Sequence, residues 1–275
     1  MTGDEAREAK LVFARLKELH EAPLRGRFDL AHLKANHAYI FQDLPHHHPG
    51  KVRPDTHAWS KLRKLEDQPS FYAVPYESVD VAGKAAAILD EFGGSDRLRG
   101  MDRNAFARTM ASLYGDLDRA HCFFEGNSRT LREFTRTLAL DAGWLLDWTP
   151  AGAGAAARNR LYLARDIAVL ERAYPGLTEE RAMRTSDRAE YEAWFMIEQV
   201  KTASRTTLSE IIRGGLRPAT TPDTKPGTSA VAEQFARFRA AGREQSAPSD
   251  QQSSSGPDAA SERRQESKGS YDPRP

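Results

Sequence analysis

A twelve-residue segment from His121 to Arg132 carries a high density of side chains that can do chemistry. It reads His-Cys-Phe-Phe-Glu-Gly-Asn-Ser-Arg-Thr-Leu-Arg. Gly126 and Asn127 permit a tight turn that exposes backbone N–H groups at the start of a helix, where the helix dipole favours an anion. Arg129 and Arg132 are three residues apart, so they share one face of that helix.

These groups suit a polyphosphate better than a single carboxylate, because two guanidiniums lie beside a helix N-terminus. Glu125 precedes the turn and is a hard oxygen ligand of the kind that holds Mg²⁺ between two phosphates. His121, at the other end of the segment, has the chemistry of a general base toward an incoming hydroxyl. The combination predicts a phosphoryl- or nucleotidyl-transfer site.

Each of these pieces has a plainer explanation when taken alone. A lone histidine at a helix end is more often a cap or a surface group. A Glu-Gly-Asn turn is usually only a turn, and arginines three apart usually form a solvated face. Their fixed spacing between two strongly periodic helical segments favours a site.

Composition limits the classes of protein to which the 275-residue chain can belong. Forty Lys and Arg against 39 Asp and Glu give a net charge of +1, so we expect no direct nucleic-acid binding. No apolar run approaches the roughly 18 residues that a membrane span needs, and the first residues lack the features of a secretion signal. The single cysteine, Cys122, excludes an internal disulfide and a Cys-rich zinc site. We therefore expect a cytoplasmic protein that does not associate with membranes.

Apolar periodicity predicts helices almost throughout residues 1–215. The predicted helices are centred on residues 12–19, 30–41, 79–92, 106–117, 131–138, 163–174 and 187–197. Asp29 is placed to cap the second, and Asp187 with Glu190 forms a capping-box pattern at the last. Residues 45–76 lack a helical period, and residues 70–74 read as a short strand. The predicted fold class is therefore all-α with one small hairpin-like insertion.

The C-terminal segment has a different composition. Residues 217–275 contain no Leu and no Ile and are rich in Pro, Ser and Gln. Such a segment buries too little apolar surface to offset its ordering entropy, so residues 216–275 are predicted to be a disordered tail after a folded domain of residues 1–215. Three apolar residues at helical spacing predict a short helix near 229–241, either a docking segment or a transient helix.

The His121–Arg132 segment resembles the signature of the Fic (filamentation induced by cAMP) family, His-x-Phe-x-Asp/Glu-Gly-Asn-Gly/Lys-Arg followed by x-x-Arg. A weaker similarity to the early helix of that family lies in residues 28–43. The resemblance covers residues 24 to about 150. It implies a helical bundle with a β-hairpin flap over the active site, which residues 59–76 would form. Members of the family typically transfer AMP from Mg²⁺-ATP to a Tyr, Thr or Ser hydroxyl of a protein.

The resemblance also implies a role for each residue of the signature. His121 would be the base that deprotonates the target hydroxyl, and Glu125 would hold Mg²⁺ against the α- and β-phosphates. Arg129 would pair with the β- and γ-phosphates, and Arg132 would reach the γ-phosphate. The residues expected to bind the nucleotide are Gly126, Asn127, Ser128, Arg129 and Arg132. The expected cofactor is Mg²⁺, with ATP as co-substrate.

The chain departs from the family pattern at several positions. Ser128 stands where Gly or Lys is usual, and because Lys marks the phosphate-transferring branch, its absence favours nucleotidyl transfer. After Asp43 the usual aromatic-x-Trp-Ala-Gly-x-x-Arg run is reduced to Gly50 and Arg53. The preceding residues 46–48 are three histidines, for which an exposed loop is expected over a metal site.

Many Fic proteins contain an inhibitory helix, Ser/Thr-x-x-x-Glu-Gly/Asn. Residues 186–190 and 206–210 have the spacing, but Tyr191 and Ile211 follow them. The resemblance therefore implies a toxin restrained by a separate small antitoxin, with a type II topoisomerase subunit as the target by analogy. The alternatives are a Fic-fold transferase with another nucleotide donor, a non-catalytic interaction module, and a translocated effector with a signal in its tail.

Overall fold

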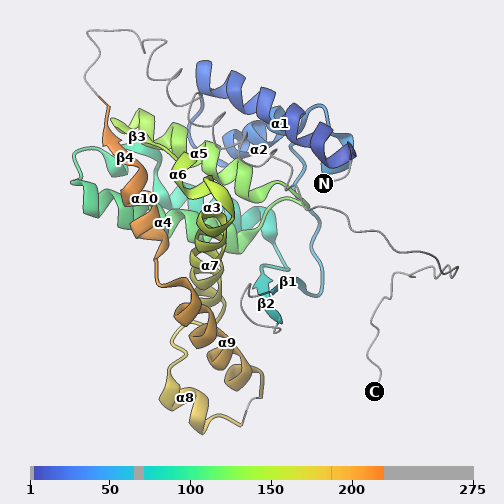
Figure 1. The fold of residues 1–275 in the computed structure, drawn as a ribbon, viewed down its shortest axis with the longest axis vertical. Coiled ribbons are helices and arrows are strands. Elements are labelled where there is room, and N and C mark those ends of the chain that lie inside the picture. The colour runs from blue at the N-terminus through green and yellow to red at the C-terminus, as the bar shows by residue number, and fades with distance from the viewer. Residues whose placement is uncertain (1–2, 65–70, 187, 220–275) are drawn as a thin grey trace, which may run out of the picture.

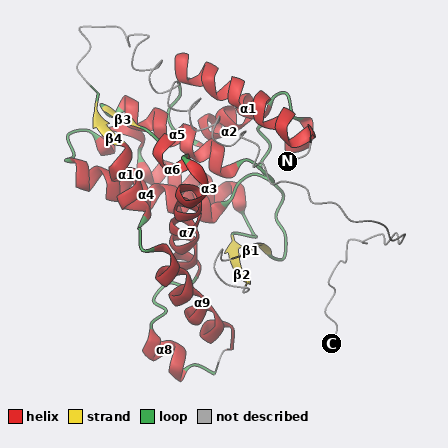
Figure 2. Cartoon of the chain, in the orientation of Figure 1, coloured by secondary structure: helices red, strands yellow, loops and turns green. Residues whose placement is uncertain are grey.

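Helices dominate the computed structural model, which describes residues 3–64, 71–186 and 188–219 (Figures 1 and 2). Two small antiparallel sheets of two strands each complete the described part of the chain. The predicted fold class, a helical bundle with a small hairpin, is confirmed. None of the described helices has the length and apolar character needed to cross a membrane.

The N-terminal half alternates helices with the hairpin. Its elements are α1 (Gly3–Glu21), α2 (Leu30–Phe41), the 3₁₀ turn η1 (Pro45–His47), β1 (Trp59–Lys64), β2 (Phe71–Tyr76), α3 (Val81–Phe92) and the 3₁₀ turn η2 (Gly94–Leu98). Asp29 caps α2 as predicted, because its side chain accepts a hydrogen bond from the N–H of His32. Gly93 ends α3 with a positive φ of 75°, which glycine adopts without strain.

The C-terminal half is helical apart from two short strands. Its elements are α4 (Arg103–Ala120), α5 (Asn127–Asp141), β3 (Trp144–Leu146), α6 (Thr149–Gly152), α7 (Gly154–Ala173), α8 (Glu179–Arg184), α9 (Arg188–Ser204), α10 (Leu208–Gly215) and β4 (Leu216–Pro218). In Figure 1, the long helix α7 runs from the centre of the molecule toward α9, which packs against it.

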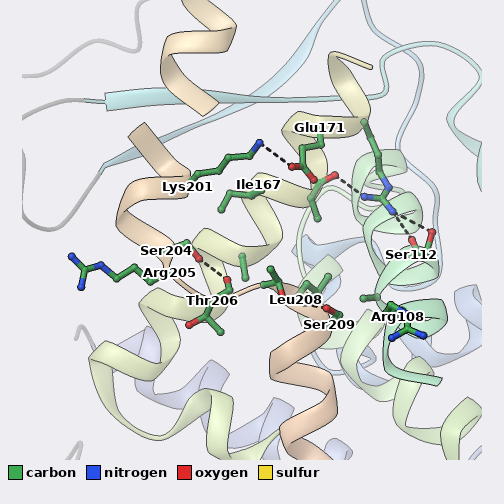
Figure 3. A pocket seen from close by; sticks show the side chains of 15 residues that line it. Arg108, Ser112, Ile167, Glu171, Lys201, Ser204, Arg205, Thr206, Leu208 and Ser209 are labelled. Atoms are coloured by element: carbon green, nitrogen blue, oxygen red, sulfur yellow. Dashed lines mark hydrogen bonds and ion pairs between the residues drawn. The ribbon is translucent and has the colours of Figure 1, made fainter. Parts of the chain in front are cut away.

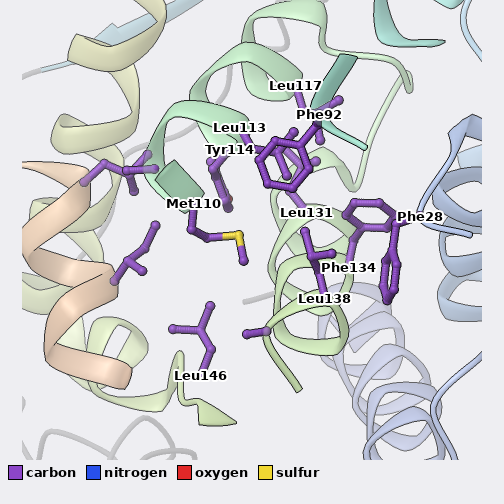
Figure 4. Close-up of a cluster of buried hydrophobic side chains, with 14 of the residues drawn as sticks. Phe28, Phe92, Met110, Leu113, Tyr114, Leu117, Leu131, Phe134, Leu138 and Leu146 are labelled. Carbon is purple, nitrogen blue, oxygen red and sulfur yellow. The ribbon is translucent and has the colours of Figure 1, made fainter. Parts of the chain in front are cut away.

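The main core lies between α4 and α5 (Figure 4). The apolar stripes predicted from their sequences face each other there. The buried residues of this contact include Phe106, Met110, Leu113, Leu117, Leu131, Phe134 and Leu138. Burial of that many large side chains fixes the two helices relative to each other. The loop that joins the end of α4 to the start of α5, which carries the signature, is therefore held by a rigid support.

The hairpin β1–β2 lies in the aperiodic segment from which a flap was expected. The two strands pair antiparallel from Trp59 opposite Tyr76 to Lys64 opposite Phe71. The strand predicted at residues 70–74 is observed at Phe71–Tyr76, and residues 65–70 lie outside the described residues. The hairpin thus places a two-stranded flap next to the end of α4, with which β2 is in contact.

Two contacts attach the hairpin to α7. The Tyr72 hydroxyl donates to Asp166 Oδ2 across 2.7 Å, and Arg63 Nε lies 3.5 Å from the same oxygen. Asp166 is buried, so removing these partners would leave a buried carboxylate without a donor. The contacts hold the flap at a defined distance from the helical core.

The folded part of the chain continues beyond residue 215. Leu216–Pro218 forms β4, which pairs with β3, and the side chain of Leu216 is only 1% exposed. The capping box at this end of the chain belongs to Thr207 and Glu210 and opens α10. The capping box predicted at Asp187 and the helix predicted at 229–241 lie outside the described residues.

Candidate active site

His121 is the residue that ends α4. Its backbone is left-handed (φ 48°, ψ 57°), and its N–H donates to the carbonyl of Leu117 across 3.1 Å. The imidazole is buried, with the ring of Tyr76 at a centroid distance of 3.8 Å. Neither ring nitrogen has a hydrogen-bond partner in the described part of the chain, although Asp118 Oδ1 lies 3.8 Å from Nδ1. A strained backbone conformation and unpaired polar atoms are typical of functional residues.

Burial lowers the pKa of His121 well below its ordinary value, and the nearby charges of Lys61, Arg165 and Arg53 lower that pKa further. The imidazole is therefore neutral at neutral pH. A neutral imidazole is the form that accepts a proton, as a general base must.

Arg53 holds the end of α4 in place. Its Nε donates to the carbonyl of His121 across 2.7 Å, and its Nη2 donates to the carbonyls of Ala120, at 3.3 Å, and Glu77. Its backbone N–H donates to the carbonyl of Cys122 across 2.8 Å. The bonds to Ala120 and His121 satisfy carbonyls that the end of α4 leaves without partners within the helix. Sequence reasoning missed this role, and the only signal for it was the remnant of the family pattern at Gly50 and Arg53.

Gly126 forms the turn between His121 and α5. Its φ is +80°, and a Cβ at this position would overlap the ring of Phe41. Asn127 closes the loop with its side chain, because Oδ1 accepts from the N–H of Phe123 at 2.9 Å and Nδ2 donates to the carbonyl of Phe123 at 2.6 Å. The amide oxygen and one Nδ2–H of Asn127 are therefore engaged in the loop, and its backbone N–H remains for an anion.

The first turn of α5 presents backbone N–H groups to the site. Asn127, Ser128 and Arg129 are its first three residues, and no side chain caps this helix end. The N–H groups of a first helical turn have no acceptors within the helix. Together with the helix dipole they form a binding site for an anion.

His37 supports the loop from α2. Its Nε2 is 3.0 Å from the carbonyl of Glu125, and its Nδ1 accepts from the N–H of Gly50 at 2.9 Å. Because one nitrogen faces a carbonyl and the other a backbone N–H, the proton is on Nε2. The ring stacks on Phe123 at a centroid distance of 3.8 Å, and burial lowers the pKa of His37 to about 4. His37 is therefore a hydrogen-bonded histidine of the core.

The two signature arginines have different surroundings. Arg129 lies over the ring of Phe41 at 4.7 Å, and its Nη1 is 3.5 Å from Glu8 Oε1 of α1. Arg132 donates from Nε to the carbonyl of Ser128 at 3.3 Å and contacts no carboxylate among the described residues. A partly buried guanidinium that lacks a counter-ion favours binding of an anion.

Glu125 exposes its carboxylate beside the turn. Its side chain is 60% exposed, and Lys61 Nζ of β1 lies 3.5 Å from Oε1. No backbone donor occupies this carboxylate in the described part of the structure. One accessible carboxylate beside an anion site fits Mg²⁺, which binds through one or two carboxylates together with waters and substrate phosphates.

A buried ion pair fixes the helix that carries His121. Arg165 of α7 donates from Nε and Nη2 to the two oxygens of Asp118 at 2.9 and 2.8 Å. The bidentate geometry sets the orientation of Asp118 one turn before His121. Sequence reasoning missed this pair, because Asp118 and Arg165 carry no signature of their own.

A separate cavity of about 550 Å³ lies between α4, α7 and the segment around α9 and α10 (Figure 3). Its lining includes Arg108, Lys201 and Ser209 but none of the seven residues predicted for the site. Lys201 is paired there with Glu171 at 3.2 Å. The cavity is therefore distinct from the signature loop.

The sequence profile of the Fic/DOC family matches residues 27–139. The matched segment contains α2, the hairpin, α4 and the complete signature loop. The chain contains a Fic domain. The residues predicted for the site lie at adjacent helix ends: His121 caps the end of α4, Gly126 precedes α5, and Asn127 to Arg132 lie in its first turns.

Two relatives show the extent of the similarity. The chain is 31% identical over 141 residues to protein adenylyltransferase VbhT of Bartonella schoenbuchensis, which is 51% of this chain and 27% of that protein. The chain thus spans about a quarter of the length of VbhT. The structure of the BepC protein of Bartonella tribocorum with bound AMPPNP is similar with a TM-score of 0.51 at 17% identity, covering 78% of this chain and 86% of BepC. This second similarity indicates a shared fold.

Proposed function

We propose that the Fic domain transfers AMP from ATP to a hydroxyl side chain of a target protein. The observation that carries the proposal is the position of a neutral, buried His121 at one end of a loop whose other end is the uncapped N-terminus of α5. The loop joins a proton acceptor to a polyphosphate site. The similarity to the adenylyltransferase VbhT and the AMPPNP in the BepC structure support ATP as the nucleotide.

In the proposed reaction, the target's Tyr, Thr or Ser hydroxyl gives its proton to His121. Its oxygen forms a bond to the α-phosphorus of ATP, and the bond from that phosphorus to the β-phosphate oxygen breaks, so pyrophosphate leaves. The N–H groups of Asn127, Ser128 and Arg129 would hold phosphate oxygens. Arg132 would bind the terminal phosphate, because its guanidinium has no carboxylate partner among the described residues.

Mg²⁺ is the cofactor that this site fits, with Glu125 as its protein ligand. The ion would neutralise charge that develops on the phosphates. Lys61 lies beside the same carboxylate, and its ammonium would move to the phosphates once the ion is bound.

The hairpin is the proposed docking edge for the target. The side chains of Leu62 and Phe71 are 69% and 61% exposed on adjacent strands. An extended segment that pairs with the hairpin would bury these apolar groups and direct its hydroxyl toward His121. The ring of Tyr76 covers His121, so docking has to displace that ring.

We further propose that the domain acts as a toxin in the cytoplasm and is restrained by a separate small antitoxin. The two glutamates with inhibitory spacing are engaged locally, Glu190 with Arg181 and Glu210 with Thr207. Arg132 is left for a carboxylate supplied by a second protein. By analogy with family toxins, the target would be a type II topoisomerase subunit.

The test uses ATP labelled at the α- or the γ-phosphate, with Mg²⁺ and a cell lysate, beside a His121→Ala variant. We expect a lysate protein to gain the α-label and not the γ-label, with an adenylyl increment in its intact mass and no transfer by the variant. Transfer of the γ-label would show phosphotransfer instead. Labelling only with another nucleotide would assign a different donor. Absence of labelling with ATP, GTP, CTP and UTP would contradict catalysis.

A further inference from the structure

Three side chains from two separate segments converge outside the signature loop. Glu8 of α1 lies between His46 and His47 of η1, with Glu8 Oε1 3.0 Å from His47 Nε2 and Glu8 Oε2 3.5 Å from His46 Nε2. One ligand atom from each of the three residues lies within 4.8 Å of the other two. Each of these atoms is a type that binds transition metals.

We propose that Glu8, His46 and His47 bind a divalent transition-metal ion of the Zn²⁺ type. Tetrahedral Zn²⁺ holds imidazole nitrogens and carboxylate oxygens at about 2.0–2.1 Å, which places its ligand atoms roughly 3.4 Å apart. The 3.0 Å from His47 Nε2 to Glu8 Oε1 and the 3.5 Å from His46 Nε2 to Glu8 Oε2 are close to that spacing. Two histidines and one glutamate form a known three-residue set for zinc, with the fourth position left to water.

The fold orders part of this site without a bound ion. The imidazole of His47 is 5% exposed and stacks on the ring of Phe41 at a centroid distance of 4.8 Å, which fixes its orientation. His46 is 65% exposed, and its ring centroid is 4.6 Å from that of His47. One ligand is held rigidly and another is free to adjust, so binding requires little rearrangement. The expectation that these histidines form a plain exposed loop does not hold for His47, which is buried.

Arg129 is the competing cation. Its Nη1 lies 3.5 Å from Glu8 Oε1, and the guanidinium also lies over the ring of Phe41. If the Glu8 carboxylate turns to a metal ion, Arg129 therefore keeps a favourable contact with the aromatic ring. The alternative, in which the Glu8 carboxylate only accepts hydrogen bonds from the two imidazoles, predicts no metal affinity. A direct binding measurement separates the two.

The experiment is a titration of the chelator-treated full chain with Zn²⁺ by calorimetry and with Co²⁺ by visible absorption. We expect one ion per chain and the intense visible bands of tetrahedral Co²⁺. Both His46→Ala and Glu8→Gln should weaken binding at least about tenfold, because each removes a ligand. Neither residue is fully buried, and thermal unfolding checks that each variant folds. His48→Ala and His57→Ala are matched controls, since both histidines are exposed and outside the cluster.

Absence of Zn²⁺ binding by the wild-type chain would overturn the proposal. It would equally be overturned if His46→Ala and Glu8→Gln bound as tightly as wild type, or if His48→Ala lost affinity to the same degree. None of these readouts depends on nucleotide transfer, so failure of the metal site is distinguishable from failure of the proposed function.

Discussion

The Nε of Arg53 donates a hydrogen bond to the carbonyl oxygen of His121 across 2.7 Å, and the two residues are 68 positions apart in the chain. This bond joins the segment before the flap to the residue that ends α4. Because Arg53 also binds the carbonyls of Ala120 and Glu77, one buried guanidinium sets the positions of the proposed base and of the segment after β2.

Arg53→Lys should slow nucleotidyl transfer at least about tenfold with little change in nucleotide KM. A lysine ammonium lacks the planar fork that reaches three carbonyls, so the backbone of His121 loses its fixed position. The free energy of unfolding should fall by about 2–4 kcal/mol, because hydrogen bonds from a buried charge are lost. Steady-state kinetics and denaturant unfolding measure the two effects. Arg25→Lys, at an exposed arginine, is the control, and an equal rise in KM would assign Arg53 to nucleotide binding instead.

His121→Ala should lower the rate of AMP transfer by roughly 10²–10⁴-fold, the usual contribution of a general base. Nucleotide affinity, measured by calorimetry, should remain close to wild type, because the anion site lies on α5. His121→Asn tests the same step with less disturbance, since asparagine tolerates the left-handed backbone of this position. Retention of full activity by the Asn variant would exclude His121 as the base.

Gly126→Ala should abolish detectable nucleotide binding. The new Cβ would overlap the Phe41 ring and would also sit on a backbone with φ of +80°. Gly93→Ala is a matched control, because Gly93 has a φ of +75° but no atom within 4 Å of the added Cβ. The control isolates the overlap from the backbone strain. Equal nucleotide affinity in the two variants would show that the turn is not shaped by Phe41.

Acid should destabilise the fold through His37. Its pKa is about 4 in the folded chain, against an ordinary value of 6.5. Between those values the unfolded chain binds the proton and the folded chain does not, so the free energy of unfolding falls as pH is lowered. Each pH unit in this window costs about 1.4 kcal/mol for one such group. Urea unfolding at several pH values measures the slope, to which buried His121 adds in the same direction.

The His37→Phe variant isolates the contribution of that residue. It removes the titrating group while an aromatic ring remains on Phe123, so the pH slope should decrease by about one proton whatever the change in absolute stability. An unchanged slope would mean that His37 is already protonated, or equally solvated, in the folded chain.

The elements that the sequence predicted best are those with a regular repeat. The apolar stripes of α4 and α5 extend over several turns, and their periodicity reflects the packing that forms the core. The signature loop was predictable for a different reason: its residues are contiguous, so local spacing alone places His121, Glu125 and Arg129 near one another.

The residues that were not predicted reach the site from distant parts of the chain. Arg53, Tyr76 and Arg165 contact His121 or its helix through tertiary packing, which leaves no periodic pattern in the sequence. The strands β3 and β4 were missed because three residues are too few for alternation to be recognised, and β4 gains its stability from pairing across 72 positions, from Leu145 to Arg217.

The ring of Tyr76 packs 3.8 Å from the His121 imidazole, and both side chains are buried away from bulk solvent. Water can take the place of a target hydroxyl in such a reaction. A base that is accessible to water would therefore promote hydrolysis of ATP in the absence of a target protein. Displacing a packed aromatic ring requires binding energy, which an extended peptide on the hairpin supplies and a single water molecule does not. In the proposed enzyme, this packing of the hairpin against His121 would disfavour hydrolysis of ATP before a protein target is present.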